Sequence, residues 1–498
     1  MAWQALVSCA LLGTERQAPP ALAGDDALGR LLGQLDGTDR EGDLLRAAGV
    51  VALWQRAGQE LLDDRQPCPP ASAADSVPVC GVRAARHLER LLQGQNVELL
   101  PEWLEQLAAV GRRVPAALLP ALLDVGARQM DVQPLLPAVL GERGDWLARQ
   151  REEWRYAVRV RDEAQWSSDS QAERLALLQY LRTVDPARGR ELLASTWDTE
   201  LARQRRAFLA VLAIGLSLED EPWLETVLDE RSAETRAAAA ALLARLPDAA
   251  LVHRLRERAL NVLRGTLAAG RLVLEVEPPE DEPALRRDGV TGAALPGAAV
   301  RLGEKAWRLC QMLAAVPPAT WCQHWQQSPA AILVAAQASE WCDALREGWL
   351  RATLCQGDAD WAEALLSLYP DHASHTAALA ALLPAARFES LLMGLLAADP
   401  ERALLILGQA QRPWSVDLGR AVLSHLRQRA AEDKTLESWA SSALHGFARW
   451  LPPQLHDEVA AGWPVEARHW PRWETALNAC LERLRLRRVM AEALRAGS

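Results

Sequence analysis

The fold is decided most clearly by residues 220–247, which read DEPWLETVLDERSAETRAAAAALLARLP. Apolar residues recur three and four positions apart on both sides of the turn at 229–232, and this spacing gives each helix one buried face. We expect Asp229 to cap the turn and Arg236 to brace it. The run of alanines allows two paired helices to approach closely. The stretch therefore predicts a helix, a short turn and a second helix.

The rest of the chain continues this pattern. Leu, Ala, Arg and Glu favour helices, whereas the residues that favour strands are scarce, with only 3 Phe and 3 Tyr among 498 residues. Prolines mostly separate apolar segments of about 10–20 residues, the usual length of one helix. Residues 220–247 resemble a HEAT repeat. We therefore expect an all-α protein, an α-solenoid of HEAT-like helix pairs.

One long interruption predicts the domain organisation. Residues 271–303 hold the only β-like run, LVLEV at 272–276, followed by an acidic stretch and several glycines. Loops longer than about 15 residues are uncommon inside a compact array. We expect an N-terminal array at 1–270, an acidic linker at 271–303 and a C-terminal array at 304–498. The linker is either a plain connection or an acidic loop that binds a partner.

The charge of the chain argues against a simple nucleic-acid binder. The formal net charge is −10, whereas free nucleic-acid binders usually carry a basic stripe. A local stripe occurs at 483–495, where five arginines face a single Glu492. Charge runs usually keep a surface hydrated, so we expect a solvated basic helix face there.

The cysteines and the apolar runs predict a cytoplasmic protein. The chain has 8 Cys and no CxxC pair, which is typical of free thiols in a reducing compartment. The longest uncharged apolar run, near 207–216, is half the ~20 residues of a membrane helix. The sequence MAWQALVSCALLG lacks the basic residue and the long apolar stretch of a signal peptide. We expect no membrane association.

Motifs of common enzymes are missing from the sequence. It contains no GxxxxGK[ST], no GxSxG, no HExxH and no CxxC zinc-ligand pair. We therefore assign no catalytic residue, no metal ligand and no cofactor, and we favour a protein without enzymatic activity. Carboxylates that distant helices bring together leave no motif, so an enzyme stays an alternative.

The first candidate binding site lies at 142–156, which we expect to form one helix. Arg143, Trp146, Arg151 and Trp154 gather there, and the two tryptophans are two helical turns apart, so they share one face. Trp and Arg dominate protein-binding hot spots, and they also stack on nucleobases. The alternative is a buried helix seam with surface Arg–Glu pairs.

The second candidate is the cluster Arg203, Arg205 and Arg206. Its guanidinium groups are suited to a phosphate or to an acidic partner surface. The alternative is that these arginines pair with Asp198 and Glu200 of the preceding turn.

Several segments resemble an uncharacterised family of bacterial helical-repeat proteins. They are ALLGTER (10–16), LLPEWL (99–104), GERGDWLARQREEW (141–154), LEDEPWLETVLDERSAETRAAAAALLARLP (218–247) and LGEKAWRLCQMLAAVPPATW (302–321). The resemblance extends to about residue 330. Members are often encoded beside MoxR-type AAA+ ATPases, SWIM zinc-finger proteins and von Willebrand factor A domain proteins. The resemblance implies such an ATPase or a von Willebrand A protein as partner, and it implies no reaction.

These observations predict a non-catalytic scaffold or adaptor that binds a protein partner, because solenoids offer long binding surfaces. The alternative is a nucleic-acid-binding or DNA-base-processing protein on a HEAT-like scaffold. That alternative requires arginines to gather in one groove despite the negative net charge, and its binding would weaken steeply as salt rises.

Overall fold

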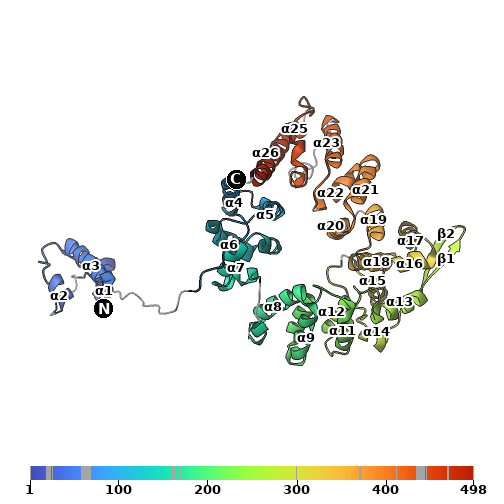
Figure 1. Cartoon of the computed structure of the whole chain (residues 1–498), viewed down its shortest axis with the longest axis horizontal. Helices are drawn as coiled ribbons and strands as arrows, with labels where there is room; N and C mark the ends of the chain where they lie inside the picture. Colours follow the sequence, from blue (N-terminus) through green and yellow to red (C-terminus); the bar gives the residue numbers. More distant parts are fainter. Residues whose placement is uncertain are drawn as a thin grey trace. The chain divides into compact units, whose positions relative to one another are not determined.

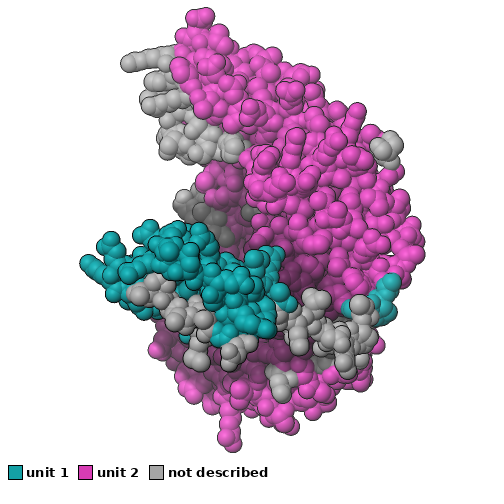
Figure 2. All heavy atoms as spheres, turned by 90° about the vertical axis from the view of Figure 1, so that its left-hand side faces the viewer, with its two compact units in different colours: residues 1–71 teal, residues 72–498 magenta. Residues whose placement is uncertain are grey.

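The structure is a computed structural model of the chain. It describes residues 2–17, 24, 26–57, 69–159, 163–168, 170–298, 300–369, 373–410, 412–432, 444, 446–467 and 470–496. Two compact units divide the chain, an N-terminal unit within residues 1–71 and a main unit within residues 72–498 (Figure 2). Both units are built from helices, so the predicted all-α, solenoid-like fold is confirmed.

The N-terminal unit consists of three helices around a small core. They are α1 (Ala2–Leu12), α2 (Ala27–Leu32) and α3 (Arg40–Ala57). The buried core residues are Leu6, Cys9, Leu32, Leu44, Ala47 and Val51. Each helix therefore buries one face, as the apolar spacing of a surface helix requires.

The main unit is a succession of short helices (Figure 1). Its first part contains α4 (Val82–Leu92), η1 (Val97–Leu99), α5 (Leu100–Ala109), η2 (Ala116–Leu118), α6 (Leu119–Arg128), η3 (Gln133–Ala138), α7 (Gly141–Ala148), η4 (Glu152–Ala157) and η5 (Glu163–Ser167). Its middle part contains α8 (Gln171–Val184), α9 (Pro186–Thr196), η6 (Trp197–Thr199), α10 (Ala202–Val211), η7 (Leu218–Asp220), α11 (Glu221–Val227), α12 (Ala233–Leu243) and α13 (Ala250–Val262).

A short hairpin and the remaining helices follow. The hairpin strands are β1 (Leu263–Ala268) and β2 (Arg271–Val276), which pair antiparallel with Leu263 opposite Val276. The helices are α14 (Pro283–Arg287), α15 (Glu304–Ala315), α16 (Ala319–Trp325), α17 (Pro329–Gln337), α18 (Cys342–Gln356), α19 (Ala359–Leu368), α20 (Ala373–Leu382), α21 (Ala385–Ala398), α22 (Pro400–Gln409), α23 (Val416–Ala431), η8 (Pro453–Leu455), α25 (His456–Ala460) and α26 (Trp470–Arg495).

The predicted helix pair at 220–247 is present as α11 and α12, but its cap differs from our prediction. Ser232, and not Asp229, caps α12, because its hydroxyl accepts a hydrogen bond from the backbone N–H of Thr235. Asp229 lies three residues too early for this role. Arg236 donates to the carbonyl oxygens of residues 230 and 231 at 2.7 and 3.0 Å, so the predicted brace of the turn is confirmed.

The segment 271–303, where we expected a linker, belongs to a core that it shares with helices on both sides. Leu274 of β2, Leu285 of α14 and Val290 are buried in the same apolar cluster as residues of α12 and α15. The loop after α14 is also fixed by side chains, since Gln311 of α15 accepts hydrogen bonds from the backbone N–H groups of Thr291 and Gly292. The segment is therefore a packed part of the main unit.

Helix α26 contributes to two apolar cores of the main unit. One core extends from Trp166 to Leu484, and the other lies around α4, α5 and α6. Leu477 and Leu484 of α26 belong to the first core, whereas Met490 and Leu494 belong to the second. This single helix therefore connects the two cores of the main unit.

The expectation of a solvated basic face at 483–495 is wrong for two of its arginines. Arg487 is 6% exposed and donates to both carboxylate oxygens of Glu102, at 2.7 and 3.0 Å. Arg483 donates to Glu98. Glutamates of η1 and α5 lie opposite this face, so the two arginines dock α26 on the early helices.

A buried ion pair fixes the packing of α8 against η7. Arg182 and Asp220 are both 0% exposed, and Arg182 donates to both Asp220 carboxylate oxygens at 2.8 and 2.9 Å. Arg182 also donates to four backbone carbonyl oxygens, of Pro186, Leu212, Ile214 and Gly215. Every side of this guanidinium is thus occupied, which is the condition for burying a charge without a large penalty.

No described helix has both the length and the apolar character that crossing a membrane requires. The described cysteines are free thiols, and Cys68 lies outside the described residues.

Candidate partner-binding groove

The floor of the candidate site is made of alanines on two neighbouring helices. Ala207 and Ala210 of α10 face Ala238 and Ala241 of α12 across a groove of about 640 Å³. Leu209 and Leu242 also line the groove, and both are buried at its base in the core. Because the amphipathic spacing places leucine inward and alanine outward, a shallow surface of methyl groups stays accessible between the two helices.

Three arginines line this floor, and we call the whole surface the arginine groove. Arg203 and Arg206 come from α10, Arg245 follows α12, and no described acidic residue lines the groove. Arg206 pairs with Glu234 at the surface, where both side chains are more than half exposed. Arg203 and Arg245 form no ion pair with any residue that the structure describes. The groove is therefore locally positive on a chain of net charge −10.

An apolar cavity of about 220 Å³ adjoins the groove, and Ala241 lines both. Its lining combines α12, α13, α15 and α18 with the loop after α14, and most of it is apolar: Ala237, Ala240, Ala241, Ala244, Leu251, Leu255, Gly289, Val290, Leu295, Ala314 and Ala315. Groove and cavity thus share one residue of the alanine-rich helix α12, Ala241.

Side-chain hydrogen bonds hold the loop that walls this cavity. Gln311 of α15 accepts from the backbone of 291 and 292 and donates to the carbonyl oxygen of Ala293 at 2.7 Å. Arg351 of α18 donates to the carbonyl oxygen of Pro296 at 3.0 Å and to the buried Glu347 at 2.7 Å. The wall is therefore fixed to two helices of the core.

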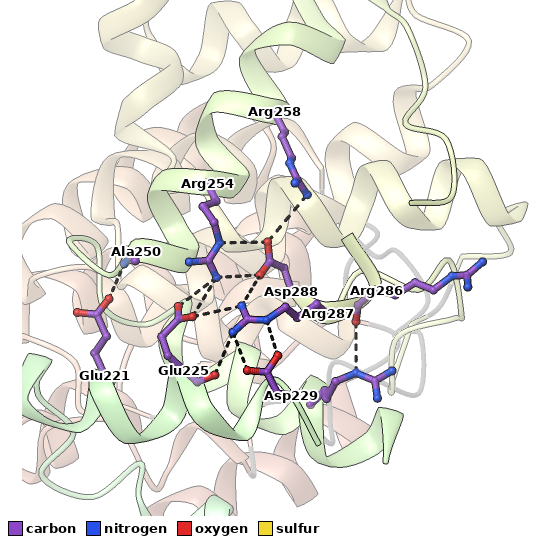
Figure 3. Close-up of polar contacts among 10 residues, drawn as sticks. Glu221, Glu225, Asp229, Ala250, Arg254, Arg258, Arg286, Arg287 and Asp288 are labelled. Carbon is purple, nitrogen blue, oxygen red and sulfur yellow. Dashed lines mark hydrogen bonds and ion pairs between the residues drawn. The ribbon is translucent and has the colours of Figure 1, made fainter. Parts of the chain in front are cut away.

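An ion-pair network holds the start of the same loop (Figure 3). Asp288 is 3% exposed and accepts from Arg254 of α13 at 2.8 Å, and Arg254 also donates to Glu225 of α11 at 3.0 Å. Arg287 donates to Asp229 at 2.6 Å, and this hydrogen bond holds the pKa of Asp229 below its ordinary value. The network connects α11, α13 and α14, and so it fixes the start of the cavity wall.

A glycine permits the closest approach of the wall to α12. Gly289 has φ +84°, and a Cβ atom at this position would lie 2.7 Å from the Cβ of Ala240. Any other residue would be strained in this backbone conformation and would also push the loop away from the helix. Gly289 therefore sets the depth of the cavity.

The polar groups that line the cavity are not arranged as a catalytic set. Burial raises the pKa of the Cys355 thiol to about 11, so the thiol is protonated at neutral pH and behaves as an apolar lining group. Both carboxylate oxygens of Asp288 already accept hydrogen bonds from Arg254. Among the described residues, no group of three or more His, Cys, Asp or Glu side chains could hold a metal ion.

The structure divides the predicted arginine cluster. Arg203 and Arg206 lie in the groove, whereas Arg205 points to another side of α10. Arg205 donates to Glu230 at 2.8 Å and stacks on Trp197 at 5.1 Å. The alternative pairing with Asp198 and Glu200 carboxylates is not observed, because Arg205 binds the backbone oxygen of residue 198 and Glu200 pairs with Arg174.

The other predicted cluster is not a single helix, which corrects our prediction for 142–156. Helix α7 ends at Ala148, and Arg151 is extended (φ −132°, ψ 138°) before η4 begins. Trp154 is buried and donates from its indole to Asp124 at 2.8 Å, so it is part of the core. Arg143 and Arg151 are exposed, and Trp146 is half-buried. Arg151 stacks on Trp154 at 4.6 Å.

Our sequence reasoning missed Arg245 and the alanine floor as parts of a site. Our prediction assigns the run AAAAA at 237–241 only to the close packing of two helices. Five consecutive alanines surround a helix on all sides, however, so at least one must face outward. That signal could have identified the floor, whereas the position of Arg245 beside α10 depends on tertiary packing.

No curated protein and no solved structure matches the chain. A family of unknown function, DUF5691, matches residues 5–494 and so also covers the part after residue 330 where the sequence resemblance was weak. The match includes both units and every residue of the groove, and the chain therefore belongs to this family of unknown function, DUF5691.

Proposed function

We propose that this protein is a non-catalytic scaffold that binds a protein partner, and that the arginine groove holds an acidic segment of this partner. The observation that carries the proposal is the presence of Arg203 and Arg245 beside an exposed alanine floor, without a carboxylate among the groove's described lining. Guanidinium groups match carboxylates in geometry and charge. An acidic chain would supply the missing counter-charges.

The alanine floor supports a polypeptide as the occupant. Small side chains at 207, 210, 238 and 241 let the backbone of a partner approach both helices closely. Carboxylates of this segment would meet arginines on both sides of the floor. Charge complementarity of this kind raises the association rate and suppresses wrong partners more than it raises affinity.

A nucleic-acid ligand fits the groove less well. Proteins that bind single strands combine arginines with aromatic side chains on which bases stack, and no aromatic residue is among those lining the groove. Binding to a duplex requires many phosphate contacts, whereas the groove offers three arginines. Nucleic acid is therefore an outcome that the experiment below must distinguish.

The sequence resemblance suggests which partner to test first. We propose a MoxR-type AAA+ ATPase or a von Willebrand factor A domain protein in the cytoplasm. The von Willebrand factor A domain protein and the ATPase are separate candidates, and each can be co-expressed with the full-length chain.

The experiment is a pull-down with the tagged full-length chain after mild crosslinking in its native host, read by mass spectrometry with and without nuclease. The test variant is R203E/R206E/R245E, and the matched control is R128E/R271E/R301E. The control arginines are exposed, apart from the groove, and form no ion pair with a described residue. We expect one stoichiometric protein that the control retains and the test variant loses.

Two results would overturn the proposal. One is a partner that R203E/R206E/R245E retains at the level of the unmodified chain. The other is nucleic acid as the retained species, with every co-purified protein lost after nuclease treatment. A third variant, R143E/R151E, reports separately on the exposed arginines of α7 and its following turn.

A further inference from the structure

The apolar cavity beside the arginine groove has a wall that side-chain hydrogen bonds hold in place. Gln311 and Arg351 fix its loop wall to α15 and α18, and the Asp288 network fixes the start of that wall. The lining atoms are mostly methyl and methylene groups. A preformed apolar cavity binds an apolar group with little loss of conformational entropy, because its loop wall is already ordered.

The size of the cavity indicates the kind of group that it takes. An engineered apolar protein cavity of about 150 Å³ binds benzene. The cavity here has a volume of about 220 Å³, so it accepts one phenyl ring or one large aliphatic side chain.

The position of the cavity relates this group to the acidic segment. Ala241 lines both the groove and the cavity, and Arg245 follows four residues later, just after the end of α12. A bulky apolar side chain in the cavity and a carboxylate on Arg245 would therefore belong to near neighbours in one peptide. Interfaces concentrate their binding energy in such a buried anchor, with charges at its edge.

We propose that the partner segment combines acidic residues with one bulky apolar side chain, and that this side chain enters the cavity between α12, α13 and α15 while the acidic residues meet Arg203, Arg206 and Arg245. This inference rests on the proposed function, because it names the chemistry of the segment that the groove would hold. It adds a specificity element that charge alone does not supply.

The test uses three fluorescein-labelled peptides of equal length and the full-length chain, with binding read by fluorescence anisotropy. The first peptide is made of Asp and Glu with one central Phe, the second replaces Phe by Ala, and the third keeps Phe but replaces the acids by Asn and Gln. We expect the Phe acidic peptide to bind at least about tenfold more tightly than the Ala acidic peptide, because burial of an aromatic ring then contributes.

Cavity-filling variants separate the cavity from the groove. Ala237 of α12 and Ala314 of α15 line the cavity only, so A237L and A314L should reduce the affinity for the Phe acidic peptide to that for the Ala acidic peptide. Neither variant should change binding of the Ala acidic peptide. The matched control is A233L, one turn earlier on α12 and exposed outside the cavity. Thermal unfolding curves verify that each variant is folded.

The outcomes distinguish the two proposals. If the Ala acidic peptide binds and R203E/R206E/R245E abolishes its binding, but Phe brings no gain, the cavity proposal is wrong and the proposed function stands. The cavity proposal is also wrong if both filling variants keep the full advantage of Phe. If neither acidic peptide binds the unmodified chain, both proposals are wrong.

Discussion

Arg182 and the arginines of the groove show how one residue type serves opposite purposes in neighbouring helices. Arg182 of α8 is 0% exposed and makes six hydrogen bonds, two of them to Asp220. Arg203 and Arg245 lie at the surface with no ion pair among the described residues. An arginine whose donors are all occupied stabilises the fold, whereas an exposed arginine without an ion pair keeps its donors available to water or to another molecule.

The largest effect is expected from Asp220→Ala. It leaves the Arg182 charge buried without its carboxylate, and breaking a buried pair on one side costs about 3–5 kcal/mol of the free energy of unfolding. Urea denaturation of the full-length chain, followed by tryptophan fluorescence, measures this loss. The neighbouring Glu219→Ala is the control, since Glu219 is 75% exposed and should change stability by less than about 0.5 kcal/mol. Equal stability of both variants would mean that the pair is dispensable.

The same pair predicts a dependence of stability on acid. Burial by itself raises the pKa of Asp220, but hydrogen bonds from Arg182 and Arg190 outweigh it and hold the pKa below its ordinary value. A carboxyl group with a depressed pKa contributes stability above its unfolded pKa and loses it as pH falls through the folded pKa. Stability should therefore fall below about pH 4. The fall should be smaller in Asp220→Ala, and an identical acid profile in both proteins would contradict the assignment.

An intermediate effect is expected from Gly289→Ala, which places a methyl group between the cavity wall and α12. The new methyl group would lie 2.7 Å from Ala240 and would sit at a positive φ, so we expect a loss of about 1–3 kcal/mol. Gly297→Ala is the matched control, because Gly297 also has a positive φ but has nothing within 4 Å of its Cβ position. Thermal unfolding separates the two. Equal losses of stability in Gly289→Ala and Gly297→Ala would contradict the prediction, because the wall would then accommodate the methyl group.

The smallest effect on stability is expected from the groove itself. Arg203→Ala, Arg206→Ala and Arg245→Ala should each change the free energy of unfolding by less than about 0.5 kcal/mol, because exposed charges contribute little. The three substitutions together should nevertheless reduce binding of an acidic peptide. A loss of stability comparable to that of Asp220→Ala would show that these arginines are structural after all.

The sequence was sufficient for the fold class and for part of the site. Leucine and alanine spacing predicted helices, and 220–247 folds as the predicted pair. Of the predicted cluster, Arg203 and Arg206 line the groove, because they lie three residues apart and so share one face of α10. Arg205 is two positions from Arg203 and so faces elsewhere. Helical spacing applied more strictly would have separated them.

Other features depend on contacts between distant parts of the chain. Residues 271–303 have the composition of a linker, yet Leu285 and Val290 are buried, and their partners on α12 and α15 cannot be read from local spacing. In the same way, the basic stripe of α26 resembles a hydrated surface until Glu98 and Glu102 are placed opposite it. Charge and apolar patterns predict which residues share a face of a helix. Whether that face is exposed or buried depends on which other helix of the chain packs against it.

The docking of α26 has a consequence for how the protein is made. Arg483 and Arg487 lie 385 residues after the glutamates that they contact. At a synthesis rate of about 5–20 residues per second, the early helices leave the ribosome roughly 20–80 seconds before Met490 and Leu494 can complete their core. During this interval the surface that α26 will cover is open to solvent and to other nascent chains. This core is therefore completed only after α26 has been synthesised, and a chaperone that shields α4 and α5 would act in that interval.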